Sequence, residues 1–250
     1  MEEVLKIEGL CKSFDDLEVL SDINLSVEKG EVVVIVGPSG CGKSTLLRCI
    51  NGLEAIKNGK VTLNGELVNP PTSDIRKFRE KIGMVFQSYD LFPHMTIIDN
   101  ITLAPVKVQK RDKKEVTKEA EELLERVGLS AKRDNYPRQL SGGQKQRVAI
   151  VRALIMHPEV LLFDEVTAAL DPEMVREVLD VILDLAAQKR TMLIVTHEMA
   201  FARAIADRIV LLDGGTIVEE SDPDSFFESP KTERAKRFLS TFEYVKETDK

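Results

Sequence analysis

A run of eight residues has the types and spacing needed to hold phosphate groups. Gly37-Pro38-Ser39-Gly40-Cys41-Gly42-Lys43-Ser44 matches the pattern G-x-x-x-x-G-K-[ST]. Its glycines let successive N–H groups converge on phosphate oxygens, and the helix expected after it presents its positive end to the same anion. Lys43 can reach the outer phosphates, and Ser44 can offer its hydroxyl to Mg²⁺. An ordinary Gly-rich turn is the weaker alternative, so we predict binding of a purine nucleoside triphosphate.

Two adjacent carboxylates follow an apolar run later in the chain. Asp164 and Glu165 come directly after residues 160–163, which read as a buried strand. Neighbouring strands of a parallel sheet deliver their carboxyl ends to the same crevice, so these acids can lie beside the phosphate loop. There Asp164 would hold Mg²⁺, and Glu165 would accept a proton from attacking water. Strands often end in polar residues, and only the phosphate loop upstream favours the functional interpretation.

Two further polar residues occupy similar positions after apolar strands. His197 follows residues 192–196, where it could hydrogen-bond the terminal phosphate. Gln87 follows residues 83–86, where it could contact Mg²⁺ or water. Position alone gives equal support to a phosphate contact for His197 and to an ordinary surface residue. For Gln87, position alone favours an ordinary surface residue.

The three cysteines, Cys11, Cys41 and Cys49, form neither a CxxC pair nor a metal-binding pattern. Cysteines that are few and odd in number are typical of a protein in a reducing compartment. Cys41 lies inside the phosphate loop, beside a helix N-terminus, a position that favours the thiolate.

Composition excludes several classes of protein. Lys and Arg total 35 against 42 Asp and Glu, a net charge of −7 that argues against a protein coating DNA or RNA. Hydrophobic residues make up 43% and charged residues 31%, as in a globular chain. The start of the chain is acidic where a signal peptide would be basic, and the uncharged run 32–42 is too short to span a bilayer. We expect a cytosolic protein, or one docked on a membrane through a partner.

The pattern of apolar residues predicts an α/β fold. Alternation over the first thirty residues indicates strands, and residues 32–36, 60–63, 82–86, 160–163, 192–195 and 209–212 indicate further strands. Asn69-Pro70-Pro71 reads as a turn, and residues 44–51, 172–187 and 199–206 read as helices. We expect one domain over 1–250: an α/β core of 1–87 and 157–250, with a helical subdomain, 88–156, inserted. The last forty residues are expected to be helical.

A second glycine-rich segment, Leu140-Ser141-Gly142-Gly143-Gln144, reads as a helix cap and turn before a helix that starts at Gln144. It can also form a second anion cradle. With Lys145-Gln146-Arg147 after it, the segment resembles the signature motif of ATP-binding cassette (ABC) ATPases. The motif order matches that family too: phosphate loop 37–45, Gln87, signature 140–144, acids 160–165, Asp171 and His197. The resemblance covers essentially the whole chain.

The resemblance implies a RecA-like P-loop NTPase core with an N-terminal antiparallel β part. It also implies a head-to-tail homodimer in which each ATP lies between one chain's phosphate loop and the other chain's signature. Phe14 stands where an aromatic ring stacks on adenine, although it could instead be a core residue beside Leu17. Catalytic roles fall to Glu165, His197 and Gln87, and Mg²⁺ contacts to Ser44, Gln87 and Asp164. The remaining nucleotide contacts fall to Gly37, Pro38, Ser39, Gly40, Cys41, Gly42, Lys43, Thr45, Ser141, Gly142, Gly143, Gln144 and Asp171.

Two residues depart from the family pattern. Where Pro-Thr-Ser-Ala-Leu-Asp is common, this chain has Val166 for the proline and Ala168 for the serine. Val166 removes a rigid turn residue, and Ala168 removes a hydroxyl that could hydrogen-bond across the dimer. Neither change removes a catalytic group.

Within the family, residues 87–96 and 100–105 resemble importers of polar amino acids. This implies transmembrane permease subunits as direct partners, an external solute-binding protein as an indirect one, and a place on the cytoplasmic face of the membrane, with no role for nucleic acid. ABC ATPases of lipoprotein release and cell division are equally short, and a short ABC ATPase of one of these complexes or for another solute is the alternative.

Overall fold

The computed structural model describes residues 2–68, 75–168 and 170–242 of the chain. The turn expected at Asn69-Pro70-Pro71 lies outside these residues. No helix in the described part is long and apolar enough to cross a membrane.

An antiparallel sheet forms the N-terminal part, as expected. Its order is β2-β1-β4-β5, from β1 (Glu3–Phe14), β2 (Leu17–Glu28), β4 (Asn58–Leu63) and β5 (Glu66–Leu67). Side chains on β2 alternate between buried and exposed, because one face of this sheet packs on the core.

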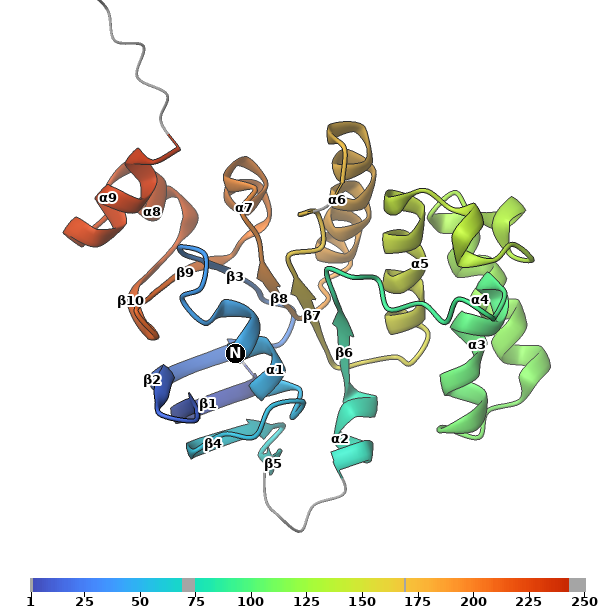
Figure 1. The fold of residues 1–250 in the computed structure, drawn as a ribbon, viewed down its shortest axis with the longest axis horizontal. Coiled ribbons are helices and arrows are strands. Elements are labelled where there is room, and N and C mark those ends of the chain that lie inside the picture. Colours follow the sequence, from blue (N-terminus) through green and yellow to red (C-terminus); the bar gives the residue numbers. More distant parts are fainter. Residues whose placement is uncertain (1, 69–74, 169, 243–250) are drawn as a thin grey trace, which may run out of the picture.

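A second sheet of six strands lies at the centre of the molecule (Figure 1). Its order is β10-β9-β3-β8-β7-β6, from β3 (Val32–Val36), β6 (Ile82–Val85), β7 (Val160–Asp164), β8 (Met192–Val195), β9 (Arg208–Asp213) and β10 (Thr216–Ser221). The strands from β9 to β6 are parallel, and β10 is antiparallel to β9. All five residues of β3 are buried, which explains its continuous apolar run.

The two faces of this sheet carry separate cores. Val33 and Ile35 face a cluster that includes the antiparallel sheet and α1 (Lys43–Ile50). Val32 and Val34 face a cluster built with the helices α5 (Gly142–Leu154), α6 (Pro172–Ala187), α7 (Met199–Ile205), α8 (Pro223–Glu228) and α9 (Glu233–Ser240). Helices α1 and α5, which begin at the two glycine-rich motifs, therefore lie on opposite faces of the sheet.

Between β6 and β7 the chain is mostly helical (Figure 1). After α2 (Ile75–Lys81) and β6, the chain forms α3 (Ile97–Lys107), α4 (Lys113–Arg126), the 3₁₀ turns η1 (Ser130–Lys132) and η2 (Pro137–Gln139), and α5. Helices α3, α4 and α5 share their own buried cluster, which includes Ile101, Ala120 and Val148.

The expectation that the last forty residues are helical is wrong at β10. This strand forms a hairpin with β9 through Gly214 and Gly215, whose φ angles of 54° and 78° suit a tight turn. Glu219 gives the strand a polar appearance, yet it is buried. Its carboxylate accepts hydrogen bonds from the backbone N–H groups of Lys231 (2.9 Å) and Thr232 (2.8 Å).

Candidate functional site

The phosphate loop joins β3 to α1, and two of its glycines are required for different reasons. A Cβ on Gly37 would lie 2.0 Å from the carbonyl oxygen of Leu212, so no side chain fits there. Gly40 has a φ of 79°, which favours glycine, and no atom lies within 4 Å of where its Cβ would be. The loop is thus packed against β9 on one side and open at Gly40, as an anion cradle requires.

Lys43 lies beneath this loop with its side chain almost completely buried. Its Nζ donates hydrogen bonds to the carbonyl oxygens of Gly37 (3.0 Å) and Pro38 (2.9 Å). It also lies 3.7 Å from Oε1 of Glu165. The loop therefore holds a cation at the point where phosphate oxygens would enter.

Ser44 and Asp164 meet beside the loop, as expected from the ends of α1 and β7. Ser44 Oγ donates a hydrogen bond to Asp164 Oδ1 at 2.6 Å. Burial raises the pKa of Asp164 above its usual value, although Ser44, Arg48 and Lys43 oppose the rise. A hydroxyl and a carboxylate are oxygen ligands of the kind that Mg²⁺ prefers when it also binds substrate phosphates. The side chains present therefore fit this ion.

Glu165 and His197 are in direct contact. Nε2 of His197 lies 2.9 Å from Oε1 of Glu165, the same oxygen that faces Lys43. Glu165 has a φ of 47°, in the left-handed region that costs energy for a residue with a side chain. Its backbone N–H is bonded to the carbonyl oxygen of Val195 at the end of β8 (3.0 Å), which holds this conformation. A carboxylate fixed between an imidazole and an ammonium group can accept a proton from water.

The second glycine-rich segment caps α5. Ser141 Oγ accepts a hydrogen bond from the N–H of Gln144 (3.3 Å), and the Gln144 side chain accepts one from the N–H of Ser141 (3.1 Å). The helix begins at Gly142, whereas the sequence predicts a start at Gln144. A Cβ on Gly142 would lie 2.8 Å from Leu170, and one on Gly143 would lie 2.9 Å from Met174. Close packing, of Gly142 against Leu170 before α6 and of Gly143 against Met174 within α6, explains both glycines.

The other predicted residues lie at the edges of the site. Phe14 is 43% exposed, with Lys12 Nζ 4.2 Å from its ring centroid, and Leu17 is 69% exposed, so a core role for Phe14 is wrong. Gln87 is exposed in the turn after β6. Asp171 is exposed at the start of α6 without capping it by its side chain, and Thr45 lies half-buried in α1.

The structure corrects the prediction for Cys41. Its side chain is buried, and a Cβ on Gly37 would lie 3.0 Å from its Sγ. Burial raises the pKa of the Cys41 thiol above its usual value, although Lys43 lowers it. Desolvation outweighs the helix N-terminus, so the thiolate is not favoured.

Sequence reasoning missed two residues that join α5 to the segment around Gln87. Gln146 is fully buried and donates a hydrogen bond to the carbonyl oxygen of Phe86 (3.1 Å). Arg152 donates to the carbonyl oxygens of Tyr89 (2.9 Å) and Asp90 (2.6 Å). The available signal was polar side chains on an otherwise apolar helix face.

Comparison with known proteins places the chain among close relatives. The profile of the ABC transporter family matches residues 20–168. The glutamate transport ATP-binding protein of Corynebacterium efficiens is 56% identical over 94% of this chain and 98% of its own length. The glutamate/aspartate import ATP-binding protein of Escherichia coli K12 is 54% identical over 95% of this chain and 98% of its own length. The glutamine transport ATP-binding protein of Bacillus subtilis is 55% identical over the same shares of the two chains.

Solved structures agree. The chain is similar to cbiO1 of Clostridium perfringens, part of the ABC transporter complex cbiONQ, with a TM-score of 0.82 and 30% identity over 96% of each chain. It is also similar to a dimeric ATP-binding cassette in a post-hydrolysis state bound to ADP and Pi. That match has a TM-score of 0.78 and 33% identity over 88% of this chain and 98% of the other. With its phosphate loop, signature and acids in place, the chain belongs to the ABC transporter family and is one of its ATPases.

Proposed function

We propose that this chain is the ATP-hydrolysing, energy-coupling subunit of an importer for polar amino acids. The observation that carries the proposal is the convergence on one oxygen, Oε1 of Glu165, of His197 (2.9 Å) and Lys43 (3.7 Å). That arrangement suits ATP hydrolysis. Relatives that match nearly the full length of the chain, at 53% to 56% identity, have names that specify transport or import of glutamate, aspartate, glutamine or arginine.

The mechanism follows from the site residues. Backbone N–H groups of residues 39–45 hold the phosphates of ATP, and Lys43 contacts the outer two. Glu165 accepts the proton of the attacking water, and His197 orients this carboxylate and hydrogen-bonds the terminal phosphate. Phe14 stacks on adenine.

Ser44, Asp164 and Gln87 would hold Mg²⁺. When bound, this ion would neutralise charge on the phosphate oxygens. The Ser44 hydroxyl already lies against Asp164, so the two ligands need little rearrangement.

A second copy of the chain completes each site. Helices α1 and α5, which begin at the two glycine-rich motifs, lie on opposite faces of the central sheet. We propose an isologous homodimer in which residues 141–144 and Asp171 of one chain face the ATP held by the other. ATP closes this dimer because only its terminal phosphate reaches both halves.

We further propose that the chain binds transmembrane permease subunits at the cytoplasmic face of the membrane, through residues around 87–100. A solute-binding protein on the other side would act on it only through the permease. Nucleic acid is not a proposed partner, in keeping with the net charge of −7. The whole chain, 1–250, forms one ABC ATPase domain, with 1–87 and 157–250 as the α/β core and 88–156 as the helical part.

Uptake measurements test the transport role. A cell lacking this chain is given labelled glutamate, glutamine, arginine or cystine, then complemented with the intact chain or with the Lys43→Ala chain. We expect loss of uptake for at least one polar amino acid, restored only by the intact chain. Normal uptake of all four would contradict the proposal and favour another ABC complex, such as one of lipoprotein release or cell division.

A further inference from the structure

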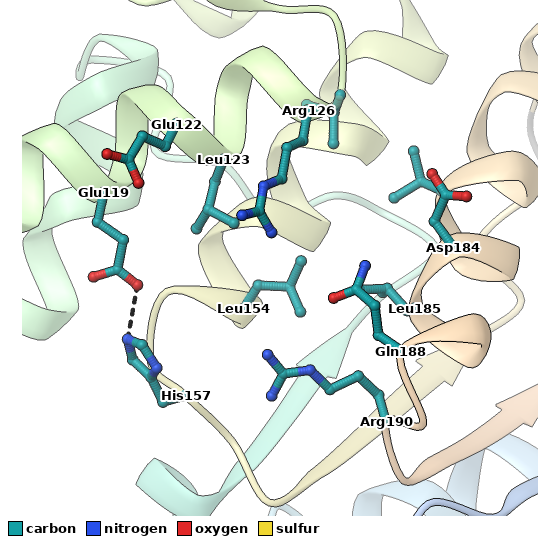
Figure 2. Close-up of a pocket in the computed structure, with 12 residues that line it drawn as sticks. Glu119, Glu122, Leu123, Arg126, Leu154, His157, Asp184, Leu185, Gln188 and Arg190 are labelled. Atoms are coloured by element: carbon teal, nitrogen blue, oxygen red, sulfur yellow. Dashed lines mark ion pairs between the residues drawn. The ribbon is translucent and has the colours of Figure 1, made fainter.

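A cavity of about 430 Å³ lies at the edge of the sheet away from the phosphate loop. We call it the seam cavity, because α4, the end of α5, the end of α6 and the loop before β8 line it (Figure 2). Its apolar surface comes from Leu123, Val127, Leu154, Val181 and Leu185. A volume of this size lies within the range of small-molecule sites, although charged and polar side chains also line this cavity.

The seam cavity is remote from the proposed ATP site. Helix α5 begins beside Ser141 and reaches the cavity at Leu154, about 20 Å away along a straight helix at 1.5 Å per residue. Helix α6 begins at Pro172, after the acids of β7, and lines the cavity with its second half, from Val181 to Leu185. A ligand of the seam cavity therefore does not compete with nucleotide for the phosphate loop.

Two guanidinium groups enter the seam cavity. Figure 2 shows Arg126, from α4, and Arg190, from the loop before β8, directed toward the space on either side of Leu154. Among the residues that the structure describes, neither side chain has an ion pair or a hydrogen bond within the chain. Gln188 points its amide into the same space. Arginine is well suited to bind planar carboxylates through paired N–H groups.

The carboxylates of the cavity wall oppose this positive charge only in part. Glu119 is bound by His157, 2.7 Å away (Figure 2), and by Arg111. Glu122 lies 4.0 Å from Lys118. Asp184 stands on the opposite wall, on α6. The cavity thus combines an aliphatic floor with two guanidinium groups that pair with no residue in the described part of the chain.

We propose that the seam cavity binds a small carboxylate with an apolar body. The carboxylate lies between Arg126 and Arg190, and the apolar part covers Leu154 and Leu185. Because Arg126 belongs to the helical part and Arg190 to the core, the bound ligand connects these two parts of the chain. This site is separate from the proposed transport function and does not depend on it.

Methyl NMR spectra of the full chain test the proposal with three matched probes. These are 4-phenylbutyrate, the neutral 4-phenylbutanol and the cationic 4-phenylbutylamine. We expect 4-phenylbutyrate to shift the methyl signals of Leu123, Leu154 and Leu185 with a Kd on the order of 1 mM, as for a ligand of this size. The alcohol and the amine should bind at least about tenfold more weakly, since they cannot pair with guanidinium.

Variants assign the binding to the two arginines. Arg126→Met and Arg190→Met should each weaken binding of 4-phenylbutyrate by about tenfold, whereas Arg190→Lys should retain part of the affinity. Arg237→Met, an exposed arginine on α9, is the matched control and should leave the Kd unchanged. Spectra of the ligand-free variants confirm that each one folds.

Three results would overturn the proposal. These are equal binding of the alcohol and the acid, unchanged affinity in both methionine variants, and displacement of 4-phenylbutyrate by ATP. The last would place the probe at the phosphate loop.

Discussion

We expect replacement of Glu165 by glutamine to separate ATP binding from ATP hydrolysis. The change keeps the size of the side chain, and the amide oxygen can still accept a hydrogen bond from His197, now 2.9 Å from Oε1. It removes the basic carboxylate, so the attacking water loses its proton acceptor. Loss of a general base lowers turnover by about 10²–10⁴-fold.

The same change should tighten ATP binding. The carboxylate lies 3.7 Å from Lys43 Nζ and competes with phosphate for this cation. Coulomb's law gives about 1 kcal/mol for such a pair in water and about 4.5 kcal/mol at an effective dielectric constant of 20. The Glu165 side chain is 22% exposed, so solvent screening favours the lower end. About 1 kcal/mol corresponds to roughly fivefold tighter binding of ATP.

Equilibrium binding of ATP and release of phosphate measure the two effects. The variant should also accumulate as an ATP-bound dimer in gel filtration, because closure is retained and reopening is blocked. Glu198→Gln is the matched control, since this exposed glutamate lies one residue beyond His197, and it should hydrolyse ATP normally. Near-normal hydrolysis by Glu165→Gln, or weaker ATP binding, would refute the assigned role.

Three further results are expected. Asp164→Asn should abolish hydrolysis yet raise Tm at pH 7 by about 2–4 °C, as a gain on the order of 1 kcal/mol gives. The raised pKa of Asp164 means that its charged form costs folding energy, so this gain should fade as the pH falls and the carboxyl becomes protonated; an unchanged or lower Tm at pH 7 contradicts it. Maleimide should label Cys41 slowly at neutral pH and faster at alkaline pH, and rapid neutral labelling, read by mass spectrometry, would show an accessible thiolate. Mixing Lys43→Ala chains with Ser141→Arg chains, each inactive alone, should restore part of the ATPase activity, because one site of the mixed dimer carries neither change; no recovery despite proven heterodimers opposes independent shared sites.

Elements with an unambiguous pattern could be predicted closely from the sequence. The expected strands 32–36 and 192–195 and the helix 172–187 coincide with β3, β8 and α6. Strands buried on both faces must be apolar throughout, which makes them easy to delimit. Pro172 at the first position of α6 marks a helix start, since its missing N–H would be unpaired there anyway.

Features that depend on tertiary contacts could not be predicted. Strand β10 carries Glu219, whose burial is possible only because backbone N–H groups of a later loop reach its carboxylate. The sequence predicts the start of α5 two residues late, since glycine is a poor helix former and its packing against Leu170 and Met174 is invisible in the sequence. The position of Cys41 beside a helix N-terminus predicts a lowered pKa, whereas its burial raises the pKa.

The site itself depends on strand order. Sequence reasoning could place Lys43, Glu165 and His197 after apolar runs, each beside a different strand. It could not show that β8 lies between β3 and β7, which brings the segments after these three strands to one place. The contact of His197 with Glu165 follows from that order. The position of His197 in the sequence alone favours neither a role in the site nor a surface residue.

Hydrogen bonds connect α5, which begins at residues 141–144, directly to the turn that carries Gln87. Gln146 and Arg152 of α5 hold the backbone on both sides of that turn, at Phe86 and at Tyr89. Gly142 lies so close to Tyr89 that a Cβ there would be 3.0 Å from its hydroxyl. A displacement of the turn that left α5 in place would therefore break these hydrogen bonds, which are partly buried at Phe86 and Tyr89. A permease that moves residues around Gln87 would thus also move Ser141, which is the property a subunit coupling transport to ATP hydrolysis requires.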